Sequence, residues 1–155
     1  VRGSYFDSPS ENYSKAELGL RISETVGKLI LHGRLYGAGS PKGSLPWFDP
    51  VAMGGFLNMS GFARNQIVGD SVSYGSVRAE KLVGQLPLGL RGDMRVGIAL
   101  ESGKVGGRFT ETNLEGWQNS VAIYAGGETP LGPVYAGYGY APNGMSNIFL
   151  FMGTP

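Results

Sequence analysis

The side chains that carry most enzyme and metal chemistry are scarce in this chain. His32 is the only histidine among 155 residues, and there is no cysteine. This composition excludes zinc–thiolate sites, iron–sulfur clusters, thiol nucleophiles and clusters of several histidines around a metal. The nearest approach to a Gly-x-Ser-x-Gly nucleophile elbow, residues 69–73, reads GDSVS and lacks the second glycine. We therefore expect no catalytic residue, no metal site and no cofactor, and we interpret His32 as a polar residue of the interior.

Six charged side chains are the other candidates for chemistry: Arg21, Arg34, Arg78, Glu80, Arg95 and Glu101. Carboxylates beside arginines could form an acid–base active site. An inner-wall network in which acids and bases neutralise one another is the simpler interpretation. The glycine-rich residues 37–43 match neither phosphate-binding spacing, so we assign them no ligand. With 13 Lys and Arg against 12 Asp and Glu, and no basic run, we expect no nucleic-acid partner.

Strands rather than helices must position these charges. Glycine makes up 27 of 155 residues, about 17%, against an average of about 7%. Apolar and polar residues alternate through most of the chain, as in residues 15–23, where Leu18 and Ile22 share one face and Arg21 lies on the other. We expect an all-β chain of eight antiparallel strands at residues 1–7, 15–23, 28–37, 72–83, 93–102, 118–128, 134–141 and 147–153, with long loops at residues 38–71 and 103–116.

Alternation leaves open which face of the strands meets water. In a soluble barrel of the lipocalin kind the apolar face points inward, whereas in a membrane barrel it meets lipid. Strands of this length can cross a bilayer, because about 9–11 tilted residues suffice. The clean strands have uncharged apolar faces, and the longest loops all fall on one side. Aromatic residues near strand ends resemble an interfacial girdle: Tyr36, Trp47, Tyr74, Trp117 and Tyr140. These features favour the membrane barrel.

Two stretches carry a family resemblance. Residues 129–133 read TPLGP, residues 135–140 read YAGYGY, a strand rich in tyrosine and glycine, and residues 148–153 form a last apolar strand. Together they resemble the C-terminus of the bacterial surface antigen superfamily, the outer-membrane assembly-factor barrels. Residues 54–62, GGFLNMSGF, are similar to that family's Gly-Gly stretch in an external loop that folds back into the lumen. This variant looks most like the barrels of patatin-like phospholipase autotransporters of the PlpD type, in which a secreted lipase and a periplasmic POTRA domain precede the barrel.

The resemblance implies a role for each group of residues. It implies a bacterial outer-membrane barrel that serves as anchor and as translocation or assembly pore for an N-terminal passenger. The six charged side chains would line the lumen, and Ser60, Gly61 and Phe62 would form the inward-loop motif. Ser60 stands where the family has an arginine, so the family's salt bridge lacks its cation here. The implied partners are outer-membrane lipid and the insertion machinery, which would read Ile148, Leu150, Met152 and Gly153 as the C-terminal insertion signal.

Eight strands are half of the sixteen usual in that family. We interpret residues 1–155 as one barrel domain, either a closed eight-stranded barrel or a fragment of a longer one. A fragment would pair with a second copy or with a missing N-terminal half, because unpaired strand edges are prohibitive in lipid. Two alternatives stay open, a soluble eight-stranded ligand-binding barrel and an enzyme with a loop-borne active site.

Overall fold

A computed structural model describes residues 1–8, 13–85, 92–107, 109, 114–130, 132–142 and 145–153. These residues form ten strands: β1 (Arg2–Ser8), β2 (Tyr13–Val26), β3 (Leu29–Gly39), β4 (Val51–Met53), β5 (Ile67–Gly69), β6 (Ser71–Gln85), β7 (Asp93–Gly106), β8 (Gln118–Thr129), β9 (Gly132–Tyr140) and β10 (Ser146–Met152). Eight of them form one antiparallel sheet in the order β1-β2-β3-β6-β7-β8-β9-β10, which confirms the all-β prediction. Within the described residues, no helix is long and apolar enough to cross a membrane.

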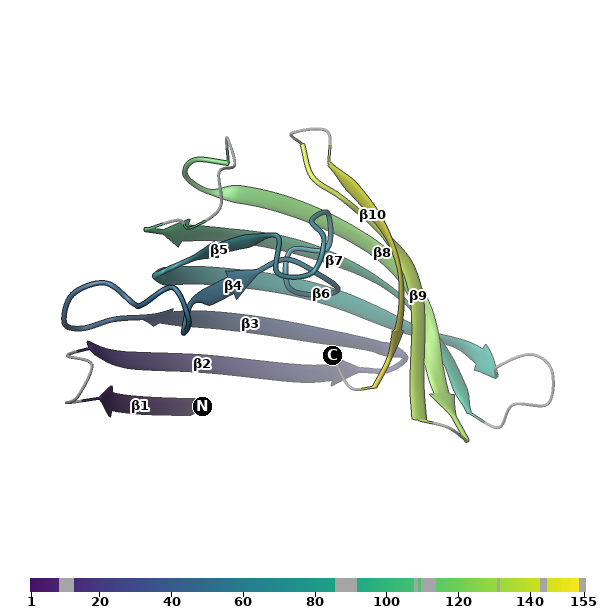
Figure 1. Cartoon of the computed structure of the whole chain (residues 1–155). Coiled ribbons are helices and arrows are strands. Elements are labelled where there is room, and N and C mark those ends of the chain that lie inside the picture. Colours follow the sequence, from purple (N-terminus) through teal and green to yellow (C-terminus); the bar gives the residue numbers. More distant parts are fainter. Residues whose placement is uncertain are drawn as a thin grey trace.

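The sheet is strongly curved and open (Figure 1). Its two edges are β1 and β10, and these strands do not pair with each other. Of the two expected arrangements, a closed eight-stranded barrel or a fragment of a longer one, the closed barrel is therefore not what this sheet forms. A closed eight-stranded barrel has an interior just wide enough for side chains, whereas the concave side here holds a backbone segment, residues 40–66, with strand β4 in it.

The pairing register fixes which residues share a face. Directly opposed residues of antiparallel strands point the same way, and Arg21 is opposite Arg34, whereas Leu20 is opposite Leu35. All six predicted lumen residues fall on one face, which we call the concave face because the segment of residues 40–66 packs on it. The alternate residues, including Leu20, form the convex face. The phases predicted for the strands from residue 15 onward agree with this register, which shifts between Leu82 and Gly84 of β6.

The long loop expected at residues 38–71 contains regular structure. Strand β3 continues to Gly39, and β4 and β5 pair as a small second sheet inside the expected loop. We call residues 40–66 the inner loop. The polar run expected to be loop from Gly103 begins as strand, since β7 continues to Gly106. Both corrections have one cause: these short segments pair through their backbone, which needs no alternation of apolar and polar residues. Part of the remaining run, residues 108 and 110–113, lies outside the described residues, as do parts of the other expected turns.

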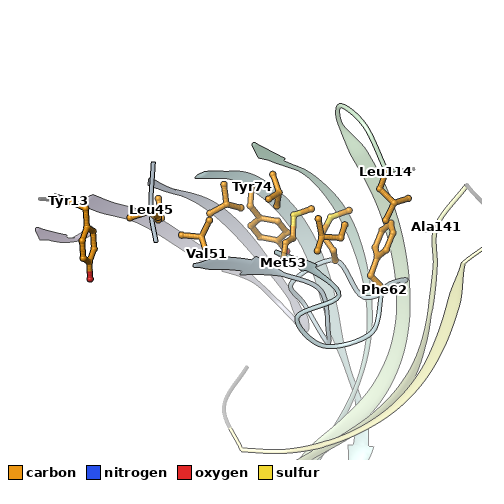
Figure 2. Close-up of a cluster of buried hydrophobic side chains, with 13 residues drawn as sticks. Tyr13, Leu45, Val51, Met53, Phe62, Tyr74, Leu114 and Ala141 are labelled. Carbon is orange, nitrogen blue, oxygen red and sulfur yellow. The ribbon is translucent and has the colours of Figure 1, made fainter. Parts of the chain in front are cut away.

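The main hydrophobic core lies between the inner loop and the concave face (Figure 2). Met53 and Phe62 of the inner loop are fully buried there, against Tyr74 and Val72 of β6 and Val105 of β7. Burying a side chain of this size contributes roughly 1.5–3 kcal/mol relative to leaving it exposed. The loop is thus held on the sheet by a core of its own.

Two residues of the expected aromatic girdle lie elsewhere. Tyr36 and Tyr74 are opposite each other on the concave face, and Tyr74 is buried in the core. The girdle interpretation is wrong for this pair because it considered only closeness to a strand end and not the face. Trp47, Trp117 and Tyr140 are exposed.

Candidate functional site

The central part of the inner loop has an unusual backbone. Gly54 and Gly55 have positive φ angles of 127° and 109°, and the non-glycine residues Leu57 and Met59 have φ angles of 53° and 73°. Residues without glycine's freedom adopt such angles at a cost of about 1–3 kcal/mol each when the surroundings hold them. Residues 54–62 are therefore held in a specific conformation by the contacts they make with the sheet.

Glu101 of β7 binds this loop through backbone amides. The Met59 N–H donates to Oε1 at 3.2 Å and the Ser60 N–H donates to Oε2 at 2.6 Å. The Tyr74 hydroxyl also donates to Oε1 at 3.0 Å. Successive N–H groups in a tight turn form a concavity that binds anions, so this loop binds a carboxylate through its backbone. Glu101 is only 3% exposed, and these three donors compensate the loss of its hydration.

Ser60 and Gly61 place the loop against two further strands. The Gly61 N–H donates to the Ser120 hydroxyl of β8 at 2.7 Å, and the Ser60 hydroxyl accepts the Leu57 N–H at 2.9 Å. A Cβ on Gly61 would lie 2.7 Å from the backbone of Ala141, beside β9. A Cβ on Gly139 of β9 would overlap the Ser60 carbonyl. Glycine is required at both positions because two backbones meet there.

Phe56 fixes the loop to the C-terminal strands. Its ring lies 4.4 Å from that of Phe149 and 5.4 Å from that of Phe151 on β10, and 5.3 Å from that of Tyr124 on β8, measured between centroids. Aromatic pairs in this range contribute about 0.5–1.5 kcal/mol beyond their buried area. The inner loop therefore contacts every strand from β6 to β10.

Glu80 is the centre of a second polar cluster. It is 3% exposed, and Tyr124 donates a hydrogen bond of 2.8 Å to its Oε1. Arg78 lies 3.7 Å from this carboxylate, and Arg95 and His32 each lie 3.8 Å from it. One buried carboxylate thus faces two guanidinium groups and an imidazole, so the cluster carries more positive than negative charge.

Arg21 and Arg34 form a third group without a carboxylate. They are directly opposed on β2 and β3, an arrangement in which like charges destabilise a sheet. Arg34 donates to the Leu57 carbonyl at 3.4 Å and lies over the rings of Tyr36 and Tyr74. Neither arginine has a carboxylate within 4.0 Å in the described part of the chain.

The predicted C-terminal signal lies on the opposite face. Ile148, Leu150 and Met152 are exposed on the convex side of β10, with 82% of Ile148 accessible. Gly153 follows the strand with φ 118°, and its N–H donates to the Pro133 carbonyl at 2.8 Å. These residues make a surface strip and take no part in the concave site.

The structure brings only some of the predicted site residues together. At the inner loop Ser60 binds Glu101, Gly61 binds Ser120 and Phe62 is buried in the core. The charged residues other than Glu101 gather around Glu80 or lie at the pair Arg21 and Arg34. The contacts made by Phe56, Tyr74 and Ser120 were not predicted from the sequence. Only the phase of the strands could have indicated two of them, because it places Tyr74 and Ser120 on the face of Glu101.

Three comparisons with known proteins bear on identity. No family model, no curated protein and no solved structure matches this chain. In the part of the chain that the structure describes, no group of three or more His, Cys, Asp or Glu side chains could hold a metal ion.

Proposed function

We propose that this chain is part of a transmembrane β-barrel of the bacterial outer membrane, acting as anchor and as translocation or assembly pore for an N-terminal passenger. The observation that carries the proposal is the distribution of exposure across the sheet. Leu18 and Leu100 are 62% and 53% exposed on the convex face, while Glu80 and Glu101 are each 3% exposed on the concave face. A face of large exposed apolar side chains is costly in water and favourable in lipid.

Charges on the convex face support the same proposal. Within the described strands, the convex-face charged residues are Asp7, Glu24, Lys81 and Lys104, and each lies within four residues of a strand end. A charge on the lipid face of a barrel costs about 2–4 kcal/mol at the bilayer midplane and about 0–1 near the interfaces. Charge only near the strand ends is the distribution that a membrane barrel requires.

The soluble alternative needs the reverse arrangement. A soluble ligand-binding barrel holds its ligand among apolar residues of the interior and presents charges to water. Here the concave face carries the charges, and the inner loop covers part of it. This arrangement supports a lumen with a folded-in loop rather than an apolar ligand cavity.

Closure of the barrel requires further strands. In lipid the free edges of β1 and β10 would leave backbone groups unsatisfied, at several kcal/mol each. The sheet has an even number of alternating strands, so β1 and β10 run in opposite directions. Antiparallel pairing at both seams is therefore possible with a second copy rotated about the barrel axis, or with an N-terminal half. We propose one of these as the partner that completes the wall.

The passenger and the insertion signal are inferred from the resemblance alone. The strip Ile148, Leu150 and Met152 would be read by the insertion machinery, and a lipase of the patatin type would be exported or anchored. We propose no enzyme activity for the barrel itself. The inner loop would restrict the lumen, since it contacts β6 to β10.

Membrane fractionation tests the proposal. The chain, expressed with a secretion signal in a bacterial host, should fractionate with the outer membrane, resist extraction by alkaline carbonate and require detergent for solubility. A matched export control is a periplasmic protein carrying the same signal. A folded, monomeric chain that stays soluble without detergent would contradict the membrane proposal and favour the soluble barrel.

A further inference from the structure

The concave face has a hollow that the proposed pore function does not use. A cavity of about 180 Å³ is lined by Arg21, Arg34, Arg78 and His32, together with Ser23 and Ser76. A water molecule occupies about 30 Å³ in the liquid, so there is room for a small anion with its hydration water. No carboxylate is among the lining residues.

The positive charge at this cavity is not compensated by the described residues around it. Glu80 is shared between Arg78, Arg95 and His32. Glu101 is occupied by the inner loop and Tyr74. Glu17, farther along β2, is 3.8 Å from Lys15. Arg21 and Arg34 thus stand directly opposite each other without an anion, although like charges in that position repel.

His32 forms part of the cavity wall. Its Nδ1 is 2.7 Å from the Ser23 hydroxyl, which fixes the ring. Its Nε2 makes no hydrogen bond and lies 3.8 Å from Oε2 of Glu80, so the imidazole is directed to that carboxylate and leaves the two opposed arginines without an anion. Guanidinium groups bind tetrahedral oxyanions through paired N–H donors, which makes arginines the residues suited to phosphate recognition.

We propose that this cavity, the arginine cavity, binds a phosphate group, either as inorganic phosphate or as the phosphomonoester of a lipid headgroup. Arg21 and Arg34 neutralise its charge, and their guanidinium N–H groups donate hydrogen bonds to it. The bound anion removes the repulsion between the two arginines, so it stabilises the folded sheet. The inference goes beyond the proposed pore function, because it concerns a ligand and holds whether or not a passenger crosses the lumen.

Calorimetric titration in detergent micelles tests the site. Sodium phosphate is titrated into the folded chain, with sodium chloride at matched ionic strength as reference. A second arm replaces phosphate by phosphatidic acid in mixed micelles, with phosphatidylcholine as reference. Saturable binding in either arm supports the proposal and identifies the source of the phosphate. Absence of binding in both arms would overturn it.

Variants locate the binding. Arg21→Gln removes a side chain that has no hydrogen bond or ion pair among the described residues, so folding should persist, and the dissociation constant should rise at least tenfold. Arg21→Gln with Arg34→Gln should abolish saturable binding. Arg64→Gln, an exposed arginine of the inner loop outside the cavity, is the matched control and should bind as the unchanged chain does. Equal binding by all of these variants would overturn the site. A membrane-inserted chain that binds no phosphate would refute this inference alone.

Discussion

In a soluble protein the apolar face of a sheet is usually buried and the charged face is exposed. In this sheet large apolar side chains are exposed on one face, and charged side chains are buried on the other. On the convex face Leu18, Leu100 and Ile148 are exposed, and on the concave face Glu80 and Glu101 are buried. Both faces come from the same alternation along the same strands. Alternation of apolar and polar residues thus defines the two faces of a sheet. The loop packed on one of them determines which face is interior.

The faces also differ in how they are held. The concave face is organised by specific contacts, in which Glu101, Tyr74 and Ser120 each bind the inner loop. The convex face makes no corresponding contacts with other described elements. On the concave face a substitution should therefore change stability by removing hydrogen-bond or packing partners. On the convex face its effect on stability should depend on whether water, detergent or lipid surrounds the side chain. The following predictions test this difference.

Glu101→Ala should have the largest effect. It removes the acceptor of the Met59, Ser60 and Tyr74 donors, and a buried donor without a partner costs about 1–3 kcal/mol. We expect the free energy of unfolding in detergent to fall by about 3–5 kcal/mol. Glu24→Ala, at an exposed position of β2, is the matched control and should change it by less than about 0.5 kcal/mol. Equal effects of the two variants would show that the loop is not held by Glu101.

Leu100→Lys should have the next largest effect, and only in a bilayer. A lysine in mid-strand on the lipid face costs about 2–4 kcal/mol, and one near the interface costs about 0–1 kcal/mol. Val26→Lys, on the same face at the end of β2, is the control. The measurement is urea unfolding from lipid vesicles. If both variants unfold at the same urea concentration as the unchanged chain, the convex face does not lie in the bilayer.

Gly61→Ala tests the close approach of the inner loop to β9. Its Cβ would lie 2.7 Å from the Ala141 nitrogen, so one of two backbones must move. Overpacking of this kind costs about 1–3 kcal/mol. Gly33→Ala is the matched control, because a Cβ there meets nothing within 4 Å. Proteolysis of the inner loop should become faster in the Gly61 variant and stay unchanged in the control, and protection in both would refute the contact.

Tyr74→Phe should have the smallest effect on the concave face. The ring keeps its packing, and only the hydroxyl that bridges Glu101 and the Leu57 carbonyl is lost. We expect a loss of about 1–1.5 kcal/mol, in line with one net hydrogen bond. Equilibrium unfolding in detergent measures this loss. A change near zero would mean that water replaces the hydroxyl.

The strands and their faces could be predicted from the sequence. Alternation placed Leu20 and Arg21 on opposite faces, and the register with Leu35 and Arg34 agrees. Long-range contacts of the inner loop could not be predicted. Ser60 and Gly61 contact β7 and β8 through backbone N–H groups, and every residue except proline has such a group, so residue types carry no signal for these bonds.

Alternation along the strands also could not predict which side chains the inner loop covers. Tyr74 reads as an aromatic near a strand end, yet it is buried beside Glu101, because the loop folds onto that face. The open edge of the sheet has the same origin. A loop that occupies the concave side leaves no room for eight strands to close on themselves, and alternation within a strand is unaffected by the total number of strands.

Spin labelling in lipid vesicles tests most directly whether the convex face meets lipid. Because the chain has no cysteine, single labels can be attached through Leu18→Cys and Arg21→Cys, two exposed positions on opposite faces of β2. We predict that the label at position 18 collides with oxygen but not with a water-soluble nickel complex, and that the label at position 21 shows the reverse. Equal access of the nickel complex to both labels would contradict a convex face in lipid.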